Sequence, residues 1–297
     1  HCYEKPCSIE ELAKLCGVPA YYIEDRMENL VNREAVIEAS KGKYQTDFVI
    51  WSDKYGIYCE ENAEKALLPI MDELLAALAN IAREAEEIDF YKAGKNEADL
   101  FYLYGCMAFS YASEHYNNLP YPGLQRKYDG YAWRYAGVME TGKHHRIHLC
   151  TWNFNSKDYS YTNYLGINGM AFRVMINDAY INACIDILQH GSTEDSDAAA
   201  CAIRDGYIRK EPDGSFSVMS PAFSKEQKEK FDAIADKYLA PLMPAYSKIV
   251  KEFLAGYKKL FPPHLNDDAD RVCQNMFRGF YNVLVQYAQR TQKIKMP

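Results

Sequence analysis

The stretch SIEELAKLCGVPAYYIEDRMENL, residues 8–30, decides the fold of the N-terminal part of the chain. Ser8 and Glu11 form a capping-box pattern, in which each side chain satisfies a free backbone N–H of the other residue at the start of a helix. Gly17 then supplies a turn residue that can take a positive φ, and Pro19 stands where a second helix begins and no N–H is needed. The stretch therefore predicts two helices joined by a tight turn, a helix-turn-helix.

The residues that follow extend this prediction to a winged helix. The first helix is expected to end near Cys16, and the run VIEASKGKYQTDFVIW holds two alternating strands, about Val36–Ala39 and Tyr44–Ile50, around a Lys-Gly-Lys turn. Two helices followed by a hairpin form a winged helix-turn-helix, which we predict for residues 1–58. The inward positions of its helices are assigned to Leu12, Ala13, Cys16, Val18, Ile23, Met27 and Leu30.

A winged helix commonly places its second helix in a DNA groove and its hairpin tip on phosphates. The candidate DNA-binding residues are Tyr21, Tyr22, Arg26, Lys41, Lys43, Tyr44 and Gln45. The same helix also presents Glu24, Asp25 and Glu28, which repel a phosphate surface, although one acid can accept from cytosine N4. Two interpretations follow: the module contacts DNA, with the hairpin favoured over the helix, or it binds protein or packs within its own chain.

Composition bounds the class of protein. Hydrophobic residues make up 48% and charged residues 25% of the 297 residues, which is typical of a globular protein with ample core material. The net charge of −7 argues against a dedicated nucleic-acid binder but permits a local basic patch. Nine Cys in apolar helical contexts indicate reduced thiols in the cytoplasm, and we expect no membrane-spanning segment or signal peptide. Because the chain starts on His1, almost at once in a helical pattern, we expect a fragment or a processed form.

The fold class predicted for the whole chain is α+β, mainly α. Beyond the first module we predict a helical segment with an aromatic-rich β-hairpin at 59–170, a winged-helix-like unit at 171–225 and a C-terminal helical hairpin at 226–297. A heptad seam runs from Leu67 to Ile88, which fits an intramolecular bundle helix, the interpretation we favour, or the coiled coil of a homodimer. A second, nearly all-apolar helix is predicted at about Glu97–Tyr116.

The middle of the chain is rich in aromatic residues. The runs YDGYAWRYAGVME and HHRIHLCTWNFN predict a long β-hairpin that turns at Thr141–Lys143. Its tyrosines and tryptophans fit either an aromatic core or a small-molecule pocket. The candidate pocket residues are Tyr104, Tyr131, Trp133 and Trp152.

Metal binding is not predicted. His144 and His148 stand four residues apart, roughly 13 Å on a strand, so they cannot share one ion. His148 and Cys150 can, but no second ligand pair at metal-site spacing supports them. We expect no metal and no cofactor.

The C-terminal part repeats the helix, helix, hairpin order. Helices are predicted at Ile176–Gly191 and Ala199–Arg204, followed by the hairpin YIRK-EPDG-SFSV, whose basic residues are Arg204, Arg209 and Lys210. Long helices follow at Ser224–Phe261, interrupted by Pro241 and Pro244, and at Asp270–Gln289. No nucleophile elbow, phosphate loop, dinucleotide-binding glycine pattern or HExxH motif is present, so we expect no enzyme.

The motifs GVPAYYIEDRMENL, GKYQTDFVIW, YDGYAWRYAGVME, CTWNFNSKDYSYTNYL and IRDGYIRKEPDGSFSVMSPAFSKEQ together resemble the C-terminal region of bacterial sigma-factor-like transcription proteins with a long C-terminal extension. The resemblance covers most of the chain. It implies a role in transcription, with the promoter-reading regions before His1, and it supplies no ligand or catalytic residue. The expected function is a ligand-responsive transcriptional regulator that contacts DNA or the transcription machinery. The alternative is a module that binds protein and not DNA.

Overall fold

The computed structural model describes residues 1–94, 97–119, 127–128, 131–132, 136–138, 150–155, 159–165, 178–219, 221–273 and 276–291. These residues form a mainly helical fold with small sheets, in agreement with the predicted α+β class. They divide into two units that each combine three segments of the chain: His1–Leu67, Asn117–His145 and Ser247–Phe280 in unit 1, and Leu68–Tyr116, Arg146–Tyr246 and Tyr281–Pro297 in unit 2.

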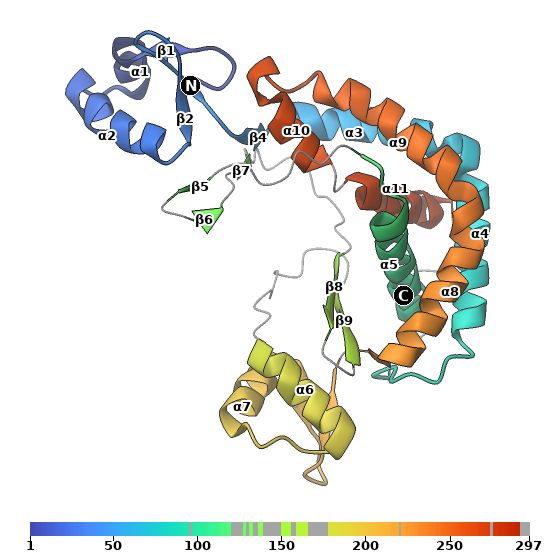
Figure 1. The fold of residues 1–297 in the computed structure, drawn as a ribbon. Helices are drawn as coiled ribbons and strands as arrows, with labels where there is room; N and C mark the ends of the chain where they lie inside the picture. The colour runs from blue at the N-terminus through green and yellow to red at the C-terminus, as the bar shows by residue number, and fades with distance from the viewer. Residues whose placement is uncertain are drawn as a thin grey trace. The chain divides into compact units, whose positions relative to one another are not determined.

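Unit 1 begins with two helices and a small sheet, which we call the N-terminal module (Figure 1). Its elements are β1 (Cys7–Ser8), α1 (Ile9–Cys16), α2 (Ala20–Asn32), β2 (Val36–Ser40) and β3 (Lys43–Thr46). The capping box of Ser8 and Glu11 is present, and Gly17 takes the left-handed conformation at φ 70°. Strand β3 pairs antiparallel with both β1 and β2. The predicted order of two helices and a hairpin is therefore confirmed.

The rest of unit 1 is held together by aromatic side chains. Its further elements are β4 (Val49–Trp51), α3 (Asp53–Leu67), β5 (Lys127–Tyr128), β6 (Tyr131–Ala132), β7 (Ala136–Val138), most of α9 (Met243–Lys258), η3 (Pro263–Leu265), α10 (Asn266–Cys273) and the start of α11 (Met276–Arg290). Tyr58 on α3 packs against Phe253 on α9, with ring centroids 5.2 Å apart. A Cβ at Gly256 would lie 3.1 Å from Tyr58 Cζ, so this glycine makes room for the tyrosine ring.

Three mutually packed helices form the centre of unit 2 (Figure 1). They are α4 (Met71–Ala85), which follows the short helix η1 (Leu68–Ile70), α5 (Glu97–Tyr116) and α8 (Lys225–Leu239), which is followed by η2 (Ala240–Leu242). The seam residues Leu74, Leu78 and Ile81 are buried, because α5 and α8 cover them. The seam therefore belongs to an intramolecular bundle, and the predicted bounds of the Glu97–Tyr116 helix are confirmed.

Unit 2 also contains a second arrangement of two helices and a hairpin. Its elements are α6 (Asp178–His190), α7 (Ser196–Arg204), β10 (Ile208–Lys210) and β11 (Phe216–Val218), as the sequence predicts. Ala183, Ala202 and Ile208 lie in one buried cluster that joins both helices to the hairpin. The burial of small residues on both helices explains why this short segment forms its own core.

The predicted aromatic hairpin is wrong for the strands that the structure describes. Strand β8 (Cys150–Asn155) pairs antiparallel with β9 (Tyr159–Leu165), which pairs in turn with β12 (Ala222–Ser224). Strand β7 instead pairs in parallel with β4. The connection from β8 to β9 is as short as the predicted turn, and alternation along a strand does not specify its partner, so the sequence pattern fits both pairings. The predicted turn at Thr141–Lys143 lies outside the described residues.

The long C-terminal helices follow the sequence prediction in part. The two prolines fall at the junction of α8 and α9, where the chain forms the short helix η2. The helix predicted from Asp270 already begins at Asn266, and its described parts are α10 and α11. None of the described helices combines the length and the hydropathy needed to cross a membrane.

Candidate macromolecular interface

Helix α2 packs against the rest of the N-terminal module through a narrow stripe of side chains. Met27 is its one buried residue, and Ile23 and Val31, four residues to either side, are partly buried against the same cluster. Four-residue spacing places these three on one face of the helix. The other faces of α2 therefore remain at the surface of the module.

The outward surface of α2 is aromatic and acidic. The side chains of Tyr21 and Tyr22 are 60% and 55% exposed, with ring centroids 4.2 Å apart. A hydrogen bond to Tyr22 is the main cause that raises the pKa of Tyr21 above its ordinary value. Arg26 pairs with Asp25 at 3.7 Å, although both side chains are exposed. The one cation among the predicted contacts on this helix is thus beside a carboxylate.

The hairpin tip carries the basic residues of the predicted DNA contact. Lys41 and Lys43 are exposed on either side of Gly42, which takes φ 68°. The Glu38 carboxylate accepts a hydrogen bond from the Gly42 N–H at 2.7 Å, so it fixes the turn from the neighbouring strand. No ion pair of Lys41 or Lys43 with a carboxylate is found among the described side chains of residues 1–50.

Two of the predicted DNA contacts point into the module. Tyr44 packs against a buried cluster, and Gln45 is only 7% exposed. The Gln45 side-chain amide donates a hydrogen bond to the backbone carbonyl of Tyr3 over 3.4 Å. The Thr46 N–H likewise donates to the Cys2 carbonyl, so residues 2–3 cover this end of β3. Tyr44 and Gln45 are therefore unsuited to contact DNA in this fold.

Three of the residues predicted to point into the module are instead exposed. Cys16, Val18 and Leu30 are exposed, whereas Leu12, Ala13 and Met27 are buried as predicted. The physical reason is that α1 has only eight residues and α2 needs one stripe to pack. The small module has too little interior to cover every apolar residue of the two helices.

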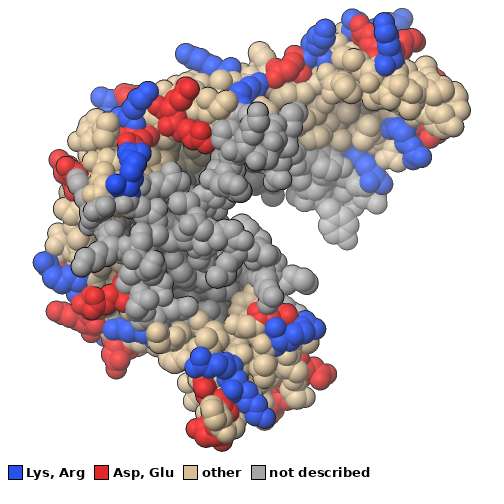
Figure 2. Space-filling model, turned by 180° about the vertical axis from the view of Figure 1, so that it is seen from behind, with Lys and Arg blue, Asp and Glu red and all other residues tan. Residues whose placement is uncertain are grey.

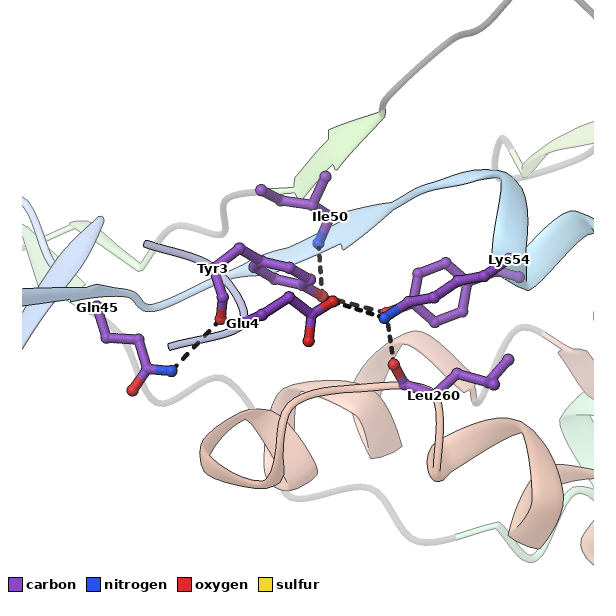
Figure 3. A network of polar contacts seen from close by, with 7 residues as sticks. Tyr3, Glu4, Gln45, Ile50, Lys54 and Leu260 are labelled. Carbon is purple, nitrogen blue, oxygen red and sulfur yellow. Dashed lines mark hydrogen bonds and ion pairs between the residues drawn. The ribbon is translucent and has the colours of Figure 1, made fainter. Parts of the chain in front are cut away.

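A polar network ties the N-terminal module to α3 and to the segment after α9 within unit 1 (Figure 3). The Ile50 N–H donates to the Tyr3 hydroxyl over 3.2 Å, and this hydroxyl lies 3.3 Å from that of Tyr55. Tyr55 in turn donates to the Leu260 carbonyl. Lys54 and Glu4 add an ion pair of 2.7 Å at the surface. Tyrosine hydroxyls and one surface ion pair thereby connect the module to the rest of unit 1.

The candidate ligand pocket is not supported at Tyr104. This side chain is 2% exposed and packs between Phe90 and Phe231 in the core of unit 2. Tyr131 and Trp152 belong to strands β6 and β8, whose side chains lie outside the description, as does Trp133 altogether. Tyr104 is therefore a core residue and not part of a pocket wall.

An open hollow does lie elsewhere on unit 2, between the ends of α4 and α8. It has a volume of about 600 Å³ and is lined by Glu84, Glu87, Ile88, Asp89, Gln227, Lys230, Ala233 and Ile234. Two of its polar residues have partners, since Glu84 pairs with Lys237 and Lys230 pairs with Glu226. The two pairs involve one acid and one base of the lining, which also contains Glu87 and Asp89.

The hairpin of β10 and β11 is less basic than its sequence indicates. Arg204 pairs with Asp205 at 2.9 Å, and Arg209 pairs with Glu211 at 2.7 Å. Figure 2 shows Lys and Arg interspersed with Asp and Glu on the displayed face. Of the predicted basic residues here, Lys210 is exposed and forms no ion pair among the described residues.

Neither a metal site nor a family relationship adds to this picture. Within the described part of the chain, no three His, Cys, Asp or Glu side chains gather closely enough to hold a metal ion, and His144 and His148 lie outside that part. Comparisons with models of protein families, with curated proteins and with solved structures found no match to this chain.

Proposed function

We propose that this chain is a transcription regulator whose N-terminal module is a winged helix-turn-helix that reaches DNA through its hairpin tip. The observation that carries the proposal is the pair of exposed lysines, Lys41 and Lys43, on a turn that Gly42 and Glu38 hold in one conformation. Hairpin tips of winged helices meet phosphates, and lysine ammonium groups are suited to that contact. The resemblance to sigma-factor-like proteins supports the same role.

The electrostatics favour the hairpin over α2 as the DNA contact. The N-terminal module, residues 1–50, has six Lys and Arg against nine Asp and Glu, a net charge of −3. Of these acids, Glu24, Asp25 and Glu28 lie exposed on α2. Two phosphate contacts give a slope of log K against log[salt] of about −1.8, and binding in the weak range of non-specific complexes, roughly 10⁻⁴ to 10⁻⁶ M.

Fluorescence anisotropy with a labelled mixed-sequence duplex at low salt tests this proposal. The double variant K41E/K43E should lose binding, because it turns both phosphate contacts into repulsions. The matched control is K251E/K259E, which makes the same change of net charge at two exposed lysines of the same unit. Binding by the parent chain that is absent or indifferent to salt, or an equal loss in both variants, would reject the proposal.

The second candidate function is a protein-interaction module that does not bind DNA. The exposed aromatic and apolar side chains of α1 and α2 favour it, because a DNA-reading surface is usually basic and polar. In this case charge reversal at Lys41 and Lys43 leaves the function intact. An assay of the chain's regulatory effect on transcription with the K41E/K43E variant separates the two candidates.

A further inference from the structure

Exposed apolar side chains are concentrated on α1, α2 and the turn between them. Eight large apolar side chains are exposed among the described residues, and five of them lie in the stretch 15–30. These five are Leu15, Val18, Tyr21, Tyr22 and Leu30. Single exposed apolar residues are ordinary on any protein, but a group of them in one short stretch indicates a surface that binds something.

The N-terminal module has no use for these side chains in its own core. Its buried cluster is filled by residues of both helices and of the hairpin, with Met27 as the buried contribution from α2. Pro19, at the N-cap of α2, also provides no side-chain hydrogen bond to the first backbone N–H groups of the helix. The aromatic pair Tyr21–Tyr22 is therefore presented outward by a helix that already has its packing contacts on another face.

Acidic residues share the helix surface with the aromatic pair. Glu24 and Glu28 follow Tyr21 at helical spacings of three and seven, so the three lie on one side of α2. Both carboxylates are exposed, and neither has an ion pair with Lys or Arg within residues 1–94, whereas Asp25 has Arg26 beside it. This surface thus combines apolar area, ring faces and unneutralised negative charge.

We propose that this surface, which we call the α2 face and define as Val18, Tyr21, Tyr22, Glu24 and Glu28, is a docking site for a basic amphipathic segment of a partner protein. Apolar side chains of the segment would cover Val18 and the tyrosine rings. Its Lys or Arg groups would pair with the two glutamates and lie over the ring faces as cation–π contacts. The chemistry of the α2 face thus defines the partner segment, which must carry an apolar stripe beside a row of Lys or Arg.

DNA and a second copy of the chain are the two alternative occupants of this surface, and both fit it less well. DNA is disfavoured because its phosphates would face Glu24 and Glu28. A second copy of the chain is disfavoured because a two-fold interface brings the same patch of both subunits together, and would oppose these glutamates to themselves. The proposal concerns α2 and not Lys41 or Lys43, so it can fail while the proposed DNA contact holds, and the reverse.

Two synthetic amphipathic peptides serve as probes with the full chain. They share one apolar face of Leu and Trp and differ only in the other face, which is Arg in the first and Glu in the second. Anisotropy of labelled peptides should show at least about tenfold tighter binding of the Arg peptide, a difference of about 1.4 kcal/mol. Binding of that peptide should weaken by a similar factor in Y21A/Y22A and in E24K/E28K, and should weaken with added salt.

The matched control for charge reversal is E61K/E73K, which changes the net charge equally at two exposed glutamates outside the N-terminal module. It should bind the Arg peptide as the parent chain does, and circular dichroism should show all variants folded. Equal binding of both peptides, or equal loss in E61K/E73K, overturns the proposal. It is also overturned if duplex DNA binding is lost in Y21A/Y22A, or if sedimentation shows a dimer that this variant dissociates.

Discussion

Tyr55 donates a hydrogen bond from its hydroxyl to the backbone carbonyl of Leu260, 205 residues further along the chain, over 3.1 Å. Its ring stacks on that of Phe261 with centroids 4.5 Å apart, and burial is the main cause that raises its pKa far above the ordinary value for tyrosine. One side chain thus fixes the start of α3 against the end of the α9 segment. The hydroxyl, rather than the ring alone, carries the specificity of this contact.

We therefore expect Tyr55→Phe to destabilise the chain. The substitution keeps the stacked ring but removes the donor to Leu260 and leaves that carbonyl without this partner, at a cost of about 1–2 kcal/mol. Urea unfolding followed by circular dichroism measures the change. An unaltered midpoint would mean that water replaces the hydroxyl without loss.

The same chemical change at Tyr104 should have the opposite result. The Tyr104 hydroxyl is buried, and no hydrogen-bond partner for it is found among the described residues. Removing an unsatisfied buried polar group avoids its desolvation penalty, so Tyr104→Phe should leave the stability at neutral pH unchanged or raise it by up to about 1 kcal/mol. Tyr55→Phe is the internal control, and a clear loss of stability in Tyr104→Phe would reveal a partner for this hydroxyl.

The stability of the parent chain and that of Tyr104→Phe should also depend differently on alkaline pH. Tyrosine ionises near pH 10 in the unfolded chain, whereas burial raises the pKa of Tyr104 to about 12 in the folded chain. The folded state therefore holds this proton more tightly, so the stability it contributes is complete below pH 10 and is lost as the pH rises through 12. The free energy of unfolding of Tyr104→Phe should accordingly fall less steeply between these two values than that of the parent chain.

Gly105 has a packing role that is specific to its lack of a side chain. A Cβ at this position of α5 would lie 2.7 Å from Cε2 and Cζ of the buried Tyr281 ring. Alanine normally stabilises a helix relative to glycine, but here it should destabilise by about 1–3 kcal/mol because the ring cannot retreat. Thermal unfolding of Gly105→Ala in the parent and in a Tyr281→Leu background measures the coupling. A similar cost in both backgrounds would place the strain elsewhere.

The seam of α4 gives a prediction about assembly. Leu74 is fully buried between helices of its own unit, so Leu74→Ala should cost about 2–5 kcal/mol through the cavity it leaves. Its sedimentation coefficient under native conditions should equal that of the parent chain. A change of oligomeric state without loss of stability would instead favour the dimer coiled coil that the heptad pattern also fits.

Local signals in the sequence predicted local structure well. Ser8, Glu11 and Gly17 each act through backbone groups within a few residues, so their effect does not depend on the rest of the fold. The same holds for Pro241 and Pro244 at the break between α8 and α9, where a helix hydrogen bond is lost whatever surrounds it. The helix ends that these residues mark could therefore be predicted from the sequence, whereas α3 was not predicted.

Long-range relationships could not be predicted in this way. Alternation in β8 predicts a strand but not its partner, which is why the hairpin pairing is wrong. Gln45 is a predicted DNA contact like Lys43, yet the backbone of residues 2–3 covers it. Likewise, nothing in the spacing of Val18 indicates that the core is already filled by other side chains.

Unit 1 is built from three segments that are far apart in the sequence, and this has a consequence for protein synthesis. Residues 1–67 cannot complete their contacts until the carbonyl of Leu260 has left the ribosome, because Tyr55 is paired with it. At roughly 5–20 residues per second, the 205 residues that follow Tyr55, up to and including Leu260, take about 10–40 s to translate. During that interval the aromatic side of α3 is exposed, so nascent chains stalled before Leu260 should be sensitive to protease there and should recruit chaperones.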